Sequence, residues 1–127
     1  MSKKEMANSQ RRLVFLTGTR ADFGKLKPLM LAVQKSTDFD LHVFVTGMHM
    51  SRKYGHTRKE VEKAGFRRIY SYINHNEGDS QDTILAKTIS GFSDYVKEIN
   101  PDMIVVHGDR PETLAGAIVG CFNNYLV

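Results

Sequence analysis

The sequence predicts an open α/β fold, a Rossmann-like parallel sheet with helices on both faces. Short apolar runs that end at a glycine alternate with segments of helical periodicity along the chain. Alternation of strand and helix favours parallel pairing with right-handed crossovers. The runs are continuously apolar, which is typical of strands buried on both faces. With 127 residues, 41% of them hydrophobic, the chain can bury the core of one domain.

The first expected strand covers 13–17 and stops at Gly18. Residues 1–11 are polar and basic, so we expect a flexible tail there and the domain over 12–127. Apolar residues at helical spacing follow, with Leu26 and Met30 among them. We place the start of this helix near Lys25, because Pro28 is tolerated only in a first turn.

The remaining elements repeat this plan. A second strand is expected over 41–46, a helix over 57–63 that ends at Gly65, and a third, edge strand over 67–73. The longest helix is expected over 81–99, ended by Asn100 and Pro101. A strand over 103–107 and a helix over 112–122 follow, with Cys121 on the apolar face of that helix. A last strand begins at 125–127, so we expect the chain to be the first part of a longer protein.

Composition excludes several classes of function. The formal net charge of +4 comes from the basic tail and a basic stretch over 52–68. No basic run interleaved with aromatic residues occurs, so nucleic acid is not expected as a partner. No segment has the length and apolarity of a membrane span or a signal peptide. A single cysteine fits a reducing compartment, and we expect a cytoplasmic protein.

Three loops after strands are expected to meet at the carboxyl edge of the sheet, where open α/β folds bind ligands. In the last of them, Asp109 and Arg110 suit proton transfer beside an anionic substrate. The alternative is that the acidic residues there cap the next helix. In the first loop, Arg20 and Lys25 with a helix N-terminus form a candidate phosphate cradle. A tight turn with surface charge explains that loop equally well.

Cofactor and metal signatures are missing from the sequence. The loop over 18–25 is neither a Walker A loop nor the GxGxxG fingerprint, so ATPase and NAD-dependent chemistry are not indicated. The five histidines lack the spacing of zinc sites, and we expect no metal. His49 is of interest because its loop is expected to face Asp109.

Three motifs, TGTRADFGKLKPL over 17–29, VTGMH over 45–49 and VHGDR over 106–110, resemble those of the UDP-N-acetylglucosamine 2-epimerase family. The Gly-Asp-Arg triplet is most similar to the hydrolysing branch, which makes N-acetylmannosamine or a related sugar for sialic acid biosynthesis. The resemblance implies a GT-B arrangement of two Rossmann-like domains, with the nucleotide sugar in the cleft between them. This chain resembles only the first portion of the N-terminal domain.

The resemblance also implies a mechanism and a set of site residues. UDP leaves as the C2 proton is lost, and water then adds to the resulting glycal with inverted configuration at C2. Asp109 corresponds to a catalytic carboxylate, and the expected substrate-binding residues are Arg20, Asp22, Lys25, His49 and Arg110. The implied partners are UDP-GlcNAc or a close relative and a second copy of the chain, as a homo-oligomer, with no cofactor. A further carboxylate and the second domain would lie after Val127, so we expect the isolated chain to be inactive.

Two other functions remain open at this point. The chain could be a non-catalytic Rossmann-like module that binds a phosphorylated ligand or a partner subunit. It could also be a self-associating fragment, since a truncated sheet exposes an edge that invites pairing.

Overall fold

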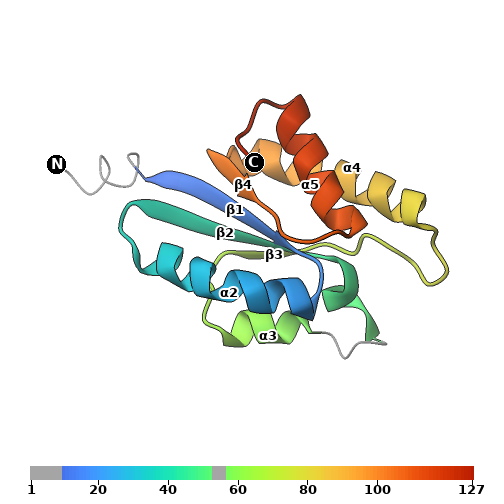
Figure 1. The fold of residues 1–127 in the computed structure, drawn as a ribbon, viewed down its shortest axis with the longest axis horizontal. Coiled ribbons are helices and arrows are strands. Elements are labelled where there is room, and N and C mark those ends of the chain that lie inside the picture. Colours follow the sequence, from blue (N-terminus) through green and yellow to red (C-terminus); the bar gives the residue numbers. More distant parts are fainter. Residues whose placement is uncertain (1–9, 53–56) are drawn as a thin grey trace.

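The chain forms one parallel sheet, seen in a computed structural model that describes residues 10–52 and 57–127 (Figure 1). The strands lie in the order β3-β2-β1-β4. This arrangement confirms the expected Rossmann-like α/β fold. The elements, in chain order, are β1 (Arg11–Thr17), α2 (Arg20–Lys35), β2 (Phe39–Val45), the 3-10 helix η1 (Gly47–Met50), α3 (Arg58–Lys63), β3 (Ile69–Ser71), α4 (Gln81–Ile99), β4 (Met103–Val105) and α5 (Pro111–Phe122).

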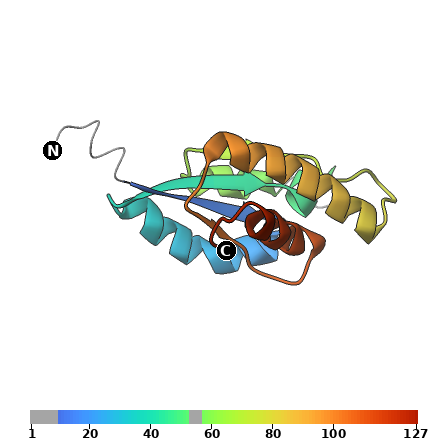
Figure 2. The ribbon, with the colours of Figure 1, turned by 90° about the horizontal axis from the view of Figure 1, so that it is seen from above.

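The sheet lies between two hydrophobic layers, and its strands contribute side chains to both. Leu13 and Phe15 of β1 pack in the layer that α2 and α3 cover. Val14 and Leu16 pack in the layer of α4 and α5. Figure 1 shows the two helix pairs on opposite sides of the sheet, and Figure 2 shows α4 and α5 side by side. Successive strand residues point to opposite faces, which explains why these runs are continuously apolar.

Helix α2 begins earlier than the sequence analysis expected. It starts at Arg20 rather than near Lys25, so Pro28 lies inside the helix. Thr19 and Asp22 form a capping box, which fixes the earlier start. Pro28 removes one hydrogen bond to the carbonyl of Gly24. Both residues are exposed, so water can bond that oxygen and the helix continues through the proline.

The strands toward the edges are shorter than expected. β3 spans only Ile69–Ser71, although it does lie at an edge of the sheet. β4 ends at Val105 rather than at His107, because its pairing with β1 stops at Phe15. The last expected strand is a single parallel bridge between Leu126 and Met103.

Helix α4 has the bounds that its apolar stripe predicts, Gln81–Ile99. It ends at Asn100, which adopts a left-handed φ of 51°. Such a conformation is common for asparagine at a helix end. None of the helices in residues 10–52 and 57–127 is long and apolar enough to cross a membrane.

Cys121 is exposed, whereas the sequence analysis placed it on the apolar face of its helix. The residues of α5 that are buried include Gly116, Val119 and Gly120. Each helical residue turns by about 100° from the one before, so Cys121 points away from the sheet that Gly120 contacts. The expected flexible tail lies outside the described residues except for its last two positions. Arg11 already belongs to β1, and Gln10 donates a hydrogen bond to the carbonyl of Thr37 at 2.9 Å.

Candidate functional site

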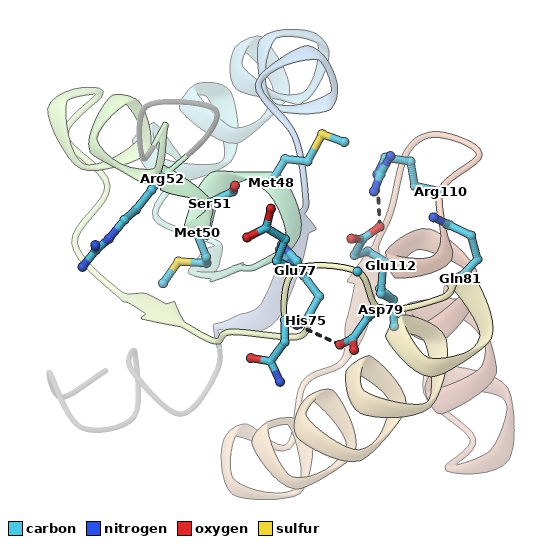
Figure 3. Close-up of a pocket in the computed structure, with 13 residues that line it drawn as sticks. Met48, Met50, Ser51, Arg52, His75, Glu77, Asp79, Gln81, Arg110 and Glu112 are labelled. Atoms are coloured by element: carbon cyan, nitrogen blue, oxygen red, sulfur yellow. Dashed lines mark hydrogen bonds and ion pairs between the residues drawn. The ribbon is translucent and has the colours of Figure 1, made fainter.

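Two neighbouring pockets open at the carboxyl edge of the sheet. The smaller, of about 430 Å³, lies between the start of α2 and the loop before α5, and we call it the Asp109 pocket. The larger, of about 690 Å³, lies between η1, the loop before α4 and the start of α5 (Figure 3). Met48 and Arg110 line both pockets. The three loops expected to meet at this edge therefore do meet.

The Asp109 pocket gathers most of the expected site residues. Asp22, Lys25, Asp109 and Arg110 all line it, and Met48 brings in the loop of His49. Asp109 is exposed at the tip of the turn after β4. Gly108 makes that turn with a φ of +119°, a conformation that side chains rarely adopt. A carboxylate, an ammonium and a guanidinium group thus share one pocket, which suits proton transfer beside an anion.

The carboxylate of Asp22 binds backbone amides at the start of the loop that the sequence analysis described as a candidate phosphate cradle. Its Oδ2 accepts the backbone N–H groups of Gly18 at 3.0 Å and Thr19 at 2.9 Å, and the Thr19 hydroxyl at 3.1 Å. The Thr17 hydroxyl also donates to this carboxylate. Two of the amides expected to bind a phosphate therefore already bind a side chain of the same protein, and phosphate binding by this loop stays a prediction.

His49 lies beneath the site rather than in it. Its side chain is fully buried, with Nε2 at 2.9 Å from Oγ1 of Thr17 and Nδ1 at 2.8 Å from Oγ1 of Thr57. Burial lowers the pKa of His49 below its usual 6.5, although Asp22 and Glu60 oppose that shift. A neutral imidazole that joins two hydroxyl groups supports the loop from below, and its role in substrate binding stays a prediction.

Arg20 is not brought into the Asp109 pocket. Its side chain is 75% exposed, and Nε lies 3.2 Å from Oε2 of Glu60 on α3. It borders two smaller hollows at the α2–α3 side. Exposed ion pairs of this kind are weak, so Arg20 is held loosely, and its expected contact with substrate also stays a prediction.

The sequence analysis missed two buried polar residues at the centre of this edge, Glu112 and Asn74. Glu112 is 2% exposed, and Asn74 is fully buried. Nδ2 of Asn74 donates to Oε1 of Glu112 at 3.2 Å, and Nε of Arg110 lies 3.3 Å from Oε2 of Glu112. Figure 3 shows the Arg110–Glu112 pair at one side of the larger pocket, with Arg52 at the other.

The glycines at the ends of β1 and β2 make room for this carboxylate. A Cβ atom on Gly18 would lie 3.2 Å from Cγ of Glu112, and one on Gly47 would lie 2.7 Å from its Oε1. Such paired glycines after adjacent strands are the one sequence signal that points to a buried group here. The alternative, in which acidic residues cap α5, holds in one part, because Glu112 lies in the first turn of that helix. Arg110 holds the N-cap position and makes no side-chain cap.

No metal site is formed by the part of the chain that the structure describes. Within residues 10–52 and 57–127, no three His, Cys, Asp or Glu side chains gather closely enough to hold an ion. The structure thus defines a class of fold: an open α/β sheet with charged side chains gathered at its carboxyl edge, the position at which such sheets bind ligands.

The comparisons with known proteins show the family. A family model described as UDP-N-acetylglucosamine 2-epimerase matches residues 31–127. A UDP-N-acetylglucosamine 2-epimerase of Neisseria meningitidis serogroup B is 46% identical over 92% of this chain and 31% of its own length. A hydrolysing UDP-N,N'-diacetylbacillosamine 2-epimerase of Legionella pneumophila is 35% identical over 90% of the chain and 31% of its own length. The chain belongs to the UDP-N-acetylglucosamine 2-epimerase family.

A solved structure agrees with this fold assignment. The UDP-GlcNAc 2-epimerase of Neisseria meningitidis bound to UDP-GlcNAc superposes with a TM-score of 0.77 at 22% identity. The match covers 89% of this chain and 30% of that one. The comparison confirms the prediction that this sheet corresponds to the N-terminal part of a GT-B fold. The chain spans about a third of the length of the curated relatives it matches.

Proposed function

We propose that the chain supplies the catalytic carboxylate and part of the nucleotide-sugar site of a hydrolysing UDP-N-acetylglucosamine 2-epimerase. The observation that carries the proposal is the Asp109 pocket, in which Asp109 is exposed beside Lys25 and Arg110. Membership of the family supports the reaction class. The name of the Legionella pneumophila relative, a hydrolysing 2-epimerase, supports the hydrolysing branch.

The proposed reaction has two stages. Asp109 takes the proton from C2 of the sugar, the C1–O bond breaks, and UDP leaves with the electron pair, so that a C1–C2 double bond remains. Water then adds a hydroxyl group to C1, and C2 regains a proton on the opposite face. The products are N-acetylmannosamine and UDP. Lys25 and Arg110 supply positive charge where negative charge grows on the leaving UDP.

An ordinary aspartate is a weak base for this step. Its usual pKa is about 3.9, far below that of a C2–H group, so the proton transfer needs nearby cations and little water. In this chain Asp109 is exposed to solvent. We therefore propose that the 127-residue chain has no turnover by itself and that a second domain closes the site.

The test is a graft of residues 10–127 into the Neisseria meningitidis relative that is 46% identical, in place of its matching stretch. UDP release and the product sugar are followed by proton NMR in D2O. Free N-acetylmannosamine with deuterium at C2 supports the proposal, whereas UDP-N-acetylmannosamine assigns the chain to the non-hydrolysing branch. Asp109→Asn is expected to lower turnover by about 10² to 10⁴-fold. The control Asp94→Asn changes an exposed residue of α4 and should keep full turnover.

The graft also tests the alternative function. A non-catalytic module that binds a phosphorylated ligand predicts UDP binding without any sugar product. Turnover that survives Asp109→Asn would instead show that the carboxylate is assigned wrongly.

A further inference from the structure

Glu112 is a buried carboxylate that the proposed reaction does not use. It is 2% exposed, and its side chain lies between Gly18, Gly47 and the start of α5. A buried charge is costly unless a partner of opposite sign compensates for it. Its partner is the guanidinium of Arg110, with 3.3 Å between Nε and Oε2.

The same pair leaves the outer part of Arg110 free. Nε of Arg110 is buried and pairs by charge with Oε2 of Glu112 without forming a hydrogen bond to it, yet the side chain as a whole is 31% exposed. The terminal nitrogens have no hydrogen bond to any residue within the described ranges, and Arg110 lines both the Asp109 pocket and the larger pocket. An arginine whose Nε faces a buried carboxylate turns its two terminal nitrogens outward as a fork, the geometry that binds phosphate oxygens.

Glu112 also connects this arginine to the opposite wall of the pockets. Asn74 donates from Nδ2 to Oε1 of Glu112 at 3.2 Å and to Oγ1 of Thr88 at 2.8 Å. Its Oδ1 accepts the backbone N–H of Gly47 at 3.1 Å, in the turn that carries Met48. One buried network therefore holds both residues that the two pockets share.

We infer that Glu112 is a positioning residue, which fixes Arg110 as the clamp for the diphosphate of the nucleotide sugar. This inference rests on the proposed function, because a diphosphate is the anion that function supplies. Glu112 acts only through Arg110 and touches no substrate itself. Its own negative charge opposes anion binding, so positioning and simple electrostatics predict opposite results when that charge is removed.

The test is a titration of UDP into the ¹⁵N-labelled 127-residue chain, observed at the Arg110 Nε–H signal. UDP is expected to shift this signal in the wild type, even at the weak affinity of an incomplete cleft. Glu112→Gln keeps the size of the side chain and removes its charge. We expect it to weaken UDP binding by about tenfold, the loss of one charge-assisted contact, and to broaden the free Arg110 signal. In an Arg110→Gln background, Glu112→Gln should then change UDP affinity no further.

Three results would overturn the inference: tighter UDP binding by Glu112→Gln, an Arg110 signal that UDP does not shift, or equal effects of Glu112→Gln with and without Arg110. If Glu112→Gln fails to fold, the variant Arg110→Lys tests the inference instead. It keeps the positive charge and removes the two terminal nitrogens of the guanidinium group. Its UDP affinity should fall, and an unchanged affinity contradicts the inference.

The control Lys97→Gln removes one exposed charge at the far end of α4. These are binding measurements with Asp109 intact, so their failure is separate from a failure of the proposed turnover.

Discussion

The carboxylate of Asp22 accepts the backbone N–H of Gly18 at 3.0 Å, so the loop after β1 is closed by its own side chain. The same oxygen accepts the N–H of Thr19 and completes the capping box of α2. The loop is thereby ordered before any substrate arrives. An anion that binds at this edge must use side chains such as Lys25 and Arg110 rather than these amides.

The first prediction concerns the hydrogen bonds that Asp22 accepts in this loop. Asp22→Ala removes the capping box and leaves the N–H groups of Gly18 and Thr19 without their acceptor. We expect the free energy of unfolding to fall by about 1–3 kcal/mol, measured by urea denaturation. The control Asp38→Ala alters an exposed aspartate and should change stability by less than about 0.5 kcal/mol. Equal losses of stability in the two variants would show that the hydrogen bonds of Asp22 do not stabilise the chain.

The strands and the ligand edge could be predicted from the sequence because their signals are local. A short, largely apolar run such as Leu13–Thr17, followed by Gly18, is typical of a buried parallel strand. The position of Asp109 at the tip of such a strand follows at once. The start of α2 was harder to place, because Pro28 gave a strong local signal and the capping box of Thr19 and Asp22 outweighed it.

The burial of Glu112 could not be predicted in the same way. A glutamate in the first turn of a helix is favoured by the helix dipole alone, so its type and position give no hint of burial. Its environment comes from Gly18, Gly47 and Asn74, which are far from it in sequence. Only the folded sheet brings these residues to one point.

The second prediction is a pH dependence that originates at His49. Burial lowers the pKa of His49 in the folded chain below 6.5. Just below that pH, His49 therefore binds a proton in the unfolded chain but stays neutral in the folded chain. The free energy of unfolding should therefore fall as the pH drops below 6.5 toward the folded pKa. His49→Gln is expected to lose less stability than the wild type between about pH 7.5 and about pH 5.5.

His42 adds to this slope with the same sign. Burial, and then the nearby Arg12, lower the pKa of His42, and they outweigh the Asp40 carboxylate, whose Oδ2 lies 3.1 Å from Nε2 of His42. The double variant His42→Gln/His49→Gln should therefore have a flatter profile than either single variant, as measured by urea denaturation at both pH values. A wild-type slope in His49→Gln would contradict the assignment.

The third prediction compares two helical glycines. Gly24 lies on the exposed side of α2, and a Cβ atom there would meet nothing within 4 Å. Gly24→Ala should stabilise the chain by about 0.5–1 kcal/mol through helix propensity. A Cβ atom on Gly91 of α4 would overlap the ring of Tyr72, whose hydroxyl donates to the carbonyl of Lys87 at 3.0 Å.

Gly91→Ala must displace that ring or break its hydrogen bond. We expect a loss of about 1–3 kcal/mol from overpacking, and a lower midpoint in thermal denaturation followed by circular dichroism. Stabilisation by both alanines would mean that the Tyr72 ring moves without cost.

The last prediction tests the crowding of the strand tips around Glu112. Gly47 and Gly65 both have left-handed φ values, +64° and +91°. A Cβ atom on Gly47 would lie 2.6 Å from the carbonyl oxygen of Gly18 and 2.7 Å from Oε1 of Glu112, whereas one on Gly65 would meet nothing within 4 Å. Gly65→Ala should therefore lose only the backbone strain, about 1–2 kcal/mol.

Gly47→Ala adds steric overlap to the same strain, because the oxygen of Gly18 belongs to the backbone and already accepts the N–H of Met48 at 2.7 Å. We expect a total loss of about 3 kcal/mol or more in urea denaturation, with Gly65→Ala as the matched control. Since Met48 lines both pockets, a folded Gly47→Ala chain should also bind UDP more weakly. Equal losses of stability in the two variants would show that the loop of Gly47 moves without cost. The close packing around Glu112 would then not restrict the conformation of this loop.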